Sequence, residues 1–217
     1  MPAYRSEDEA EIRRAVVAHL RTLRPGARIM HEINACSFGN RIDVLAVDEA
    51  EIVAVEIKSR KDKLDRLPDQ VTAMRGVTHN VIAAIHERFL RDSFVGVLAP
   101  EEARDAVVWV WPVAERRGHV ECGIEWRDRS RWQKLIPKCL PPGAIDILWA
   151  AELREICAGL GMRGVAKLTM PVAIDEIRWR MTGEEITRAI CAALRARECP
   201  EADAPIAAND NATTLVA

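Results

Sequence analysis

Three charged residues interrupt two neighbouring apolar runs between residues 41 and 60 (RIDVLAVDEAEIVAVEIKSR): Asp43, Glu56 and Lys58. A charge inside an apolar strand costs free energy unless it is paired. A symmetric turn at Glu49-Ala50 predicts a hairpin in which Asp43 lies opposite Glu56. Lys58 follows on the same face as Glu56, because side chains alternate along a strand. The three charges are therefore predicted to form one group.

Two facing carboxylates repel each other, and a divalent cation between them would relieve the repulsion. Carboxylates are hard oxygen ligands of the kind that Mg²⁺ prefers. With Asp43 and Glu56 as metal ligands, Lys58 could orient an attacking water or stabilise charge on a phosphate, which is the chemistry of phosphodiester hydrolysis. Two alternatives stay open: an internal ion pair between Lys58 and one carboxylate, and exposure of all three residues at strand ends.

A mixed α/β fold is expected to position this group. Ser6 and Glu9 form a capping box that opens a helix over residues 6–24. Further strands are predicted over 28–34, 81–85, 94–98 and 107–113, and a helix over 67–76. Strands and helices in this order make a mixed sheet with helices on its faces.

The chain of 217 residues divides into four predicted segments. These are an α/β core over 1–113, an irregular Arg- and Trp-containing connection over 114–142, a small helical subdomain over 143–199 and a disordered tail over 200–217. One C-terminal helix is expected over 144–158, and another begins at the capping box of Thr182 and Glu185. We expect this helical part to be a packing appendage or an oligomerisation surface, with a DNA-reading module as the alternative.

The overall composition narrows the class of protein. The formal net charge of −2 gives no global basic field, so nucleic-acid binding would need a local basic patch. The six cysteines make no CxxC pair, which is typical of a reduced cytosol. The N-terminus is acidic, and no apolar run approaches the roughly 20 residues that span a bilayer. A cytoplasmic protein without membrane contact is expected, and a homo-oligomer stays open.

The charged group resembles the D…(D/E)-x-K signature of the PD-(D/E)XK nuclease superfamily, whose fold is called restriction-endonuclease-like. Asp43 supplies the first carboxylate, and Glu56-Ile57-Lys58 supplies the second motif. The wider pattern over 41–43, 55–59 and 62–70 is similar to a little-characterised bacterial and phage group of that superfamily. The resemblance covers residues 6–98 and is faint beyond them. Ile42 stands where the proline of the family's name would be.

The resemblance implies a metal-dependent nuclease that hydrolyses phosphodiester bonds, most naturally in DNA, with Mg²⁺ or Mn²⁺ as cofactor. Asp43 and Glu56 would hold the metal together with the backbone carbonyl of Ile57, and Lys58 would be the catalytic lysine. Glu32 is the preferred further ligand. Glu9 and Glu11 are the alternatives to it.

Residues beside the motif are expected to contact the substrate: Gln70, Ser59, Arg60, Lys61 and Arg66. Gln70 matches a glutamine of many relatives, although Met74 replaces the tyrosine that often follows it. A second basic cluster over 116–138 includes Trp126 and Trp132 and is a candidate nucleic-acid surface, with an ordinary amphipathic surface as the alternative, because acidic residues interrupt the cluster. The alternative function is a catalytically silent module that binds nucleic acid or a partner protein.

Overall fold

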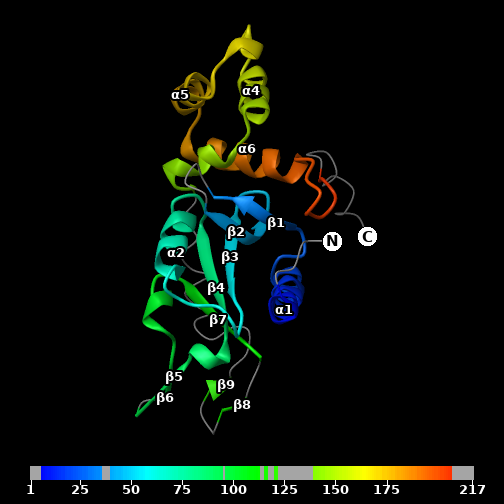
Figure 1. Cartoon of the computed structure of the whole chain (residues 1–217). Coiled ribbons are helices and arrows are strands. Elements are labelled where there is room, and N and C mark those ends of the chain that lie inside the picture. Colours follow the sequence, from blue (N-terminus) through cyan, green and yellow to red (C-terminus); the bar gives the residue numbers. More distant parts are fainter. Residues whose placement is uncertain are drawn as a thin grey trace.

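A five-stranded mixed sheet forms the centre of the computed structural model, which describes residues 6–35, 40–94, 96–112, 115–116, 120–121 and 139–206. The strand order is β1-β2-β3-β4-β7 (Figure 1). The strands are β1 (Arg28–Asn34), β2 (Arg41–Val47), β3 (Ile52–Lys58), β4 (Asn80–His86) and β7 (Val107–Trp111). The first three are antiparallel neighbours, and β3, β4 and β7 are parallel. The predicted mixed α/β fold is confirmed.

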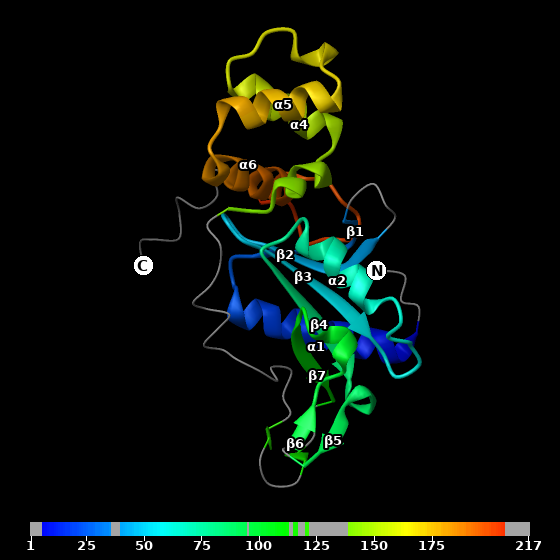
Figure 2. The ribbon, with the colours of Figure 1, turned by 90° about the vertical axis from the view of Figure 1, so that its left-hand side faces the viewer.

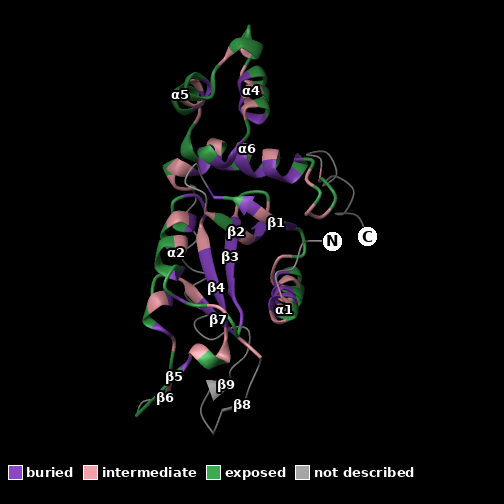
Figure 3. Ribbon diagram, in the orientation of Figure 1, coloured by how far each residue is buried: buried purple, intermediate pink, exposed green. Residues whose placement is uncertain are grey.

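Helices cover both faces of this sheet (Figure 1). On one face α1 (Glu7–Leu23) buries Ile12 and Val16 in a cluster with Trp109. On the other face α2 (Leu67–Arg75) buries Val71 and Met74. The strands between them are almost entirely buried (Figure 3). Burial on both faces explains why these strands are continuous apolar runs.

The C-terminal part is mainly helical, as predicted. It consists of η3 (Pro142–Ile147), α4 (Ala150–Gly159), η4 (Val165–Lys167), α5 (Met170–Arg180) and α6 (Gly183–Ala196). Helix α6 lies between the sheet and the α4–α5 pair (Figures 1 and 2). The fully buried Arg28 of β1 donates to the carbonyl oxygens of Leu194 and Arg195 at 2.7 and 2.9 Å. The end of α6 is thereby fixed to the edge strand of the sheet.

The strand predicted over 94–98 is wrong, because this segment forms a short hairpin outside the central sheet. Two short strands, β5 (Arg91–Ser93) and β6 (Gly96–Leu98), make a separate hairpin. Phe94 at its turn is fully exposed. The remaining short elements are η1 (Glu87–Phe89), η2 (Glu101–Ala103), β8 (Glu115–Arg116) and β9 (Val120–Glu121). An apolar run of this length does not by itself distinguish a sheet strand from an exposed hairpin.

The helix predicted over 144–158 is interrupted. η3 ends at Ile147, and α4 begins only at Ala150, because Trp149 is an extended N-terminal cap. The Glu152 side chain accepts a hydrogen bond from the Trp149 N–H at 2.7 Å. Trp149 is 54% exposed. The cap formed by Trp149 and Glu152 therefore starts a new helix within the segment that was predicted to be one continuous helix.

The tail predicted to be disordered from Pro200 is ordered in its first part. Ala202 forms an antiparallel bridge with Met30 of β1. Asp203 accepts from the Ile29 N–H through its carboxylate at 3.0 Å. An edge strand leaves N–H and C=O groups unpaired, and these residues satisfy them. Residues 207–217 lie outside the described part of the chain.

The capping box predicted at the start of α1 is half formed. Ser6 Oγ accepts from the Glu9 N–H at 3.2 Å. The Glu9 side chain turns to Arg13 instead of returning to Ser6. At α6 both halves of the box form between Thr182 and Glu185. Within the described part of the chain, no helix has both the length and the apolar character needed to span a membrane.

Candidate active site

The antiparallel ladder between β2 and β3 ends beside Asp43. It follows the predicted register as far as Val44↔Val55, so the symmetric turn was predicted correctly. Asp43 and Glu56 come next but form no ladder pair. Asp43 Oδ2 instead accepts a hydrogen bond from the Ile57 N–H at 2.8 Å. The carboxylate of Asp43 therefore reaches β3 at the point where the ladder ends.

Lys58 and Glu56 form a buried ion pair near the end of β3. Lys58 Nζ lies 2.7 Å from Glu56 Oε1 and donates to Gln70 Oε1 at 2.8 Å. Gln70, from α2, also donates its amide to Glu56 Oε1. Glu56 Oε2 is buried and has no hydrogen-bond partner among the described residues. The internal ion pair considered from the sequence is present, and it leaves one carboxylate oxygen of Glu56 unsatisfied.

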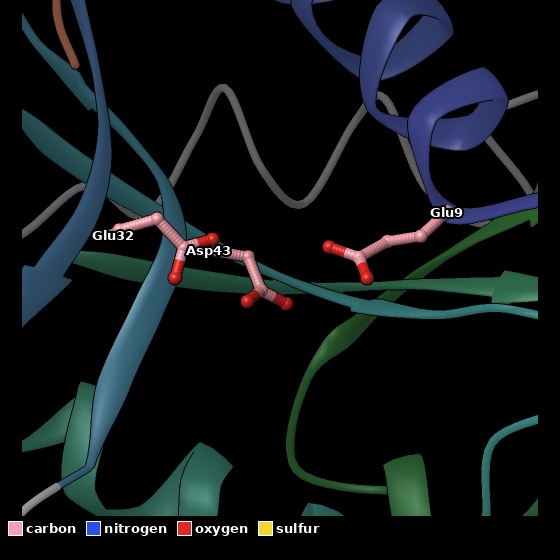
Figure 4. Close-up of side chains that lie close together, drawn as sticks. All are labelled: Glu9, Glu32 and Asp43. Atoms are coloured by element: carbon pink, nitrogen blue, oxygen red, sulfur yellow. The ribbon is translucent and has the colours of Figure 1, made fainter. Parts of the chain in front are cut away.

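Arg13, from α1, brings three carboxylates together. Its Nη2 lies 2.7 Å from Glu9 Oε1, 2.8 Å from Glu32 Oε1 and 3.8 Å from Asp43 Oδ1. Its Nη1 donates to the backbone oxygen of Asp43 at 2.6 Å. One oxygen from each carboxylate lies within 4.8 Å of the others. Figure 4 shows Glu9 facing Glu32 and Asp43 across this space. The Arg13 guanidinium balances part of the negative charge of the three.

Glu32 reaches this group through an unusual backbone conformation. Its φ of 57° lies in the left-handed region, which costs a non-glycine residue about 1–2 kcal/mol. The β1–β2 ladder pairs His31 and Ile33 with β2 but skips Glu32. Glu32 Oε2 also lies 2.6 Å from Arg41 Nε. These contacts compensate for the backbone strain and hold the carboxylate beside Asp43.

Burial changes the titration of both central carboxyls. It raises the pKa of Asp43 to about 6, against the lowering effects of the Ile57 N–H and Arg13. Burial, and then the negative charge of Asp43, raise the pKa of Glu56 to about 7, against the lowering effect of Lys58. A divalent cation would favour the ionised form of each. Near neutral pH, protons and a divalent cation therefore compete for the carboxylates of Asp43 and Glu56.

Asp43, Glu56 and Lys58 line one cleft of about 720 Å³. Its described lining has equal numbers of acidic and basic side chains. The acidic ones are Glu9, Asp43, Glu56, Asp62 and Asp65, and the basic ones are Arg41, Lys58, Lys61, Lys63 and Arg66. A divalent cation would make this balanced lining positive and attractive to phosphate.

The residues predicted to contact substrate lie in different environments. Ser59, Lys61, Arg66 and Gln70 line the cleft, whereas Arg60 is exposed and is not among its lining residues. Gln70 is engaged with Lys58 and Glu56. The Ser59 N–H and hydroxyl both donate to Asp62 Oδ2 at 2.7 Å. Lys61 and Arg66 are the members of this set best placed to meet an anion in the cleft.

Sequence reasoning missed Arg13 and Arg41. The spacing of Glu9 and Arg13, four residues apart on a helix, was a signal for an ion pair. Nothing local indicated that this pair would be buried. Of the two predicted alternatives to Glu32, Glu9 joins the carboxylate cluster, whereas Glu11 is exposed. The side chains of the basic cluster over 116–138 lie outside what the structure describes.

Fold and site together define a mixed α/β protein with a carboxylate–lysine group, made of Asp43, Glu56 and Lys58, at the end of an antiparallel ladder. Residues 3–99 match the model of the family described as Bacteriophage P4 protein cII. The matched segment contains the whole carboxylate–lysine group. Membership of the PD-(D/E)XK nuclease superfamily was therefore a wrong prediction. Two carboxylates and a lysine at this spacing are a short pattern that chance also produces.

No curated protein and no solved structure matches the chain. The restriction-endonuclease-like form of the sheet therefore stays a prediction, while the mixed α/β architecture is established by the strand order.

Proposed function

We propose that this protein hydrolyses phosphodiester bonds in DNA with the help of a divalent cation. The observation that carries the proposal is the group formed by the buried Glu56 and Lys58 with the half-buried Asp43, which opens onto one cleft that basic side chains also line. The proposal rests on this geometry and not on family membership. Raised carboxyl pKa values beside a lysine are typical of functional sites.

The residues present fit Mg²⁺ or Mn²⁺. Glu56 Oε2 is a buried carboxylate oxygen without a hydrogen-bond partner in the described chain. Asp43 supplies a second carboxylate, and Ile57 lines the same cleft. The Ile57 side chain packs in the core on the α1 face, so its backbone is the part available to a ligand. A cation held by Asp43, Glu56 and the Ile57 carbonyl would neutralise the carboxylates and polarise a phosphate oxygen.

Lys58 is held ready for an anion or a water molecule. An ammonium group has three N–H donors, and contacts with Glu56 and Gln70 use two of them. The third remains for a phosphate oxygen or the attacking water. Its orientation is fixed by the two acceptors, so little ordering is needed when substrate binds. Lys61 and Arg66 can contact the flanking phosphates.

A second function is favoured by the contacts of Arg13. Its guanidinium lies between Glu9 and Glu32 and close to Asp43, where it satisfies negative charge without a metal. A protein with this arrangement could bind nucleic acid, or a partner protein, without cleaving it. The two functions differ in whether a cation binds at Asp43 and Glu56.

Cleavage assays on the purified full chain separate the two functions. Labelled single-stranded DNA, duplex DNA and RNA are incubated with Mg²⁺, with Mn²⁺ and with EDTA. We expect metal-dependent cleavage of DNA that falls at least roughly 100-fold in Asp43→Asn and Lys58→Met, since each removes a ligand or a positioned charge. Asp175→Asn and Lys167→Met are matched controls on exposed residues outside the cleft.

The outcome decides between the functions as follows. Cleavage that survives in both Asp43→Asn and Lys58→Met would place the activity elsewhere or in a contaminant. Binding of DNA without cleavage under any of the metal conditions, together with no uptake of Mn²⁺ by calorimetry, would favour the binding function.

A further inference from the structure

The cleft continues on both sides of the carboxylate–lysine group. A hollow of about 490 Å³ shares Asn34 and Arg41 with it, on the side of the C-terminal helices. A hollow of about 370 Å³ shares Asp62 and Lys63 with it, on the side of η1. Neighbouring hollows have lining residues in common and therefore adjoin, and the three together are called the groove below. A groove that extends past the reacting group in both directions suits a polymer better than a small molecule.

Trp149 provides an aromatic surface in the hollow near the C-terminal helices. Arg197 Cζ lies 4.3 Å from the centroid of the Trp149 ring, and Trp149 is nevertheless 54% exposed. Glu152 binds the Arg197 guanidinium through both carboxylate oxygens at 2.6 Å and accepts from the Trp149 N–H. Contacts with Glu152 therefore hold the Arg197 guanidinium against the Trp149 ring, while part of the ring stays accessible to a ligand.

The charges of this hollow select against a phosphate within it. Three carboxylates line it, those of Glu32, Asp146 and Glu201, while its basic residues are Arg41 and Arg197, and the charge of Arg197 is already paired with Glu152. These carboxylates would repel a phosphate, but they can accept hydrogen bonds from the amino groups of a nucleobase. Arg41, at the boundary with the main cleft, is the basic residue placed to meet the phosphate that follows such a base.

We propose that the hollow beside Trp149 binds an unpaired base of single-stranded DNA, stacked on the indole ring, with the adjoining phosphate at Arg41. The inference rests on the proposed function, because it names the substrate of the same groove. A base in a duplex is stacked between its neighbours and cannot enter such a hollow without leaving the helix. The protein therefore prefers single-stranded over duplex DNA.

Fluorescence anisotropy with the full-length protein tests this, with Ca²⁺ replacing Mg²⁺ and the DNA checked as intact afterwards. We expect Trp149→Ala to weaken binding of a labelled single-stranded oligonucleotide by roughly 5- to 150-fold, the range of one lost base stack. Trp149→Phe keeps an aromatic ring and should retain most of the affinity. Trp179→Ala is the matched control, because Trp179 is 88% exposed on α5 and does not line the groove.

A second measurement needs no variant and so does not depend on folding. Wild-type protein should bind an oligonucleotide of abasic sites more weakly than one with bases, because stacking requires a base. Equal affinity for the two, or unchanged affinity in folded Trp149→Ala, would overturn the inference. If the protein cleaves DNA but shows either of these two overturning results, the proposed function stands without this subsite. Base-dependent binding without cleavage would instead remove the proposed function and leave the subsite in place.

Discussion

Asp43 and Glu56 are the residues whose ionisation connects stability with metal binding. Glu56 is buried and Asp43 is half-buried, and loss of contact with water raises the pKa of each carboxyl, to about 6 for Asp43 and about 7 for Glu56. A carboxyl with a raised pKa stabilises the fold fully at a pH below its unfolded value. That stability is lost as the pH rises through the folded value. Without a cation, the protein should therefore lose stability between about pH 4 and pH 7.

Replacing Asp43 by Asn should increase the stability of the metal-free protein at high pH. Asn keeps an oxygen that can accept from the Ile57 N–H but carries no charge to bury. We expect a gain in the free energy of unfolding of roughly 1–3 kcal/mol at pH 8, shrinking as the pH falls and approaching zero below about pH 4, where the wild-type carboxyl becomes protonated in both states. Urea denaturation in EDTA at several pH values measures it. Asp175→Asn should show no such pH dependence, and a loss of stability at pH 8 in Asp43→Asn would contradict the argument.

Metal affinity should rise with pH over the same region. Asp43 and Glu56 must lose their protons to bind a cation, so binding releases protons below about pH 7. Isothermal calorimetry with Mn²⁺ at pH 6 and pH 8, in buffers of different ionisation enthalpy, measures both affinity and proton release. We expect roughly 10-fold tighter binding or more at pH 8. Equal affinity at both pH values would show that these carboxyls are not the ligands.

At the scale of elements, the site forms where regular pairing stops. The β2–β3 ladder ends at Val44↔Val55, and the β1–β2 ladder skips Glu32. Both interruptions flank Asp43, so its side chain can contact β3 and α1 together. α1 contributes Glu9 and Arg13, and α2 contributes Gln70. A regular sheet would have left these side chains apart, since successive residues point to opposite faces.

The attachment of α6 to β1 depends on Arg28, which donates to two carbonyl oxygens at the end of that helix. Arg28→Met should lower the free energy of unfolding by roughly 1–3 kcal/mol, because it leaves buried carbonyls without donors. Chemical denaturation measures the change. Arg14→Met, on an exposed position of α1, should change it little. Equal effects of the two substitutions would mean that Arg28 does not fix the helix.

At the scale of the whole molecule, residues of the C-terminal part and of the sheet line one hollow together. The chain beyond α6 returns to β1, where His31 N–H donates to the Glu201 oxygen at 2.8 Å and Asp203 accepts from Ile29. Trp149 and Arg197 then lie next to the edge that carries Glu32. The helical part and the sheet thus build one wall each of the same hollow.

Asp203→Ala should loosen this return segment. The variant loses hydrogen bonds to the Ile29 N–H and to Arg21. We expect a loss of roughly 1–2 kcal/mol and faster hydrogen exchange at the amides of Ile29 and His31. Exchange measured by NMR or mass spectrometry reports on it, with the exposed Glu198→Ala as the control. Unchanged exchange at both amides would show that the segment is held by other contacts.

The sequence by itself determined the sheet strands, the helices that flank them and the register of the central hairpin. These follow from local patterns, because apolar runs, turns and capping residues act within a few positions of one another. It also brought Asp43, Glu56 and Lys58 together, since a hairpin with a known turn fixes which residues are near.

Only the tertiary structure decided how those charges are balanced. Arg13 and Gln70 come from helices that pack on opposite faces of the sheet, and no local pattern links them to the hairpin. The left-handed backbone of Glu32 and the placement of Trp149 beside the groove likewise depend on contacts between distant segments. The three charges in the hairpin are a local property of the sequence. Their burial, their pKa values and the groove in front of them arise from packing, because burial of a charge depends on everything that surrounds it.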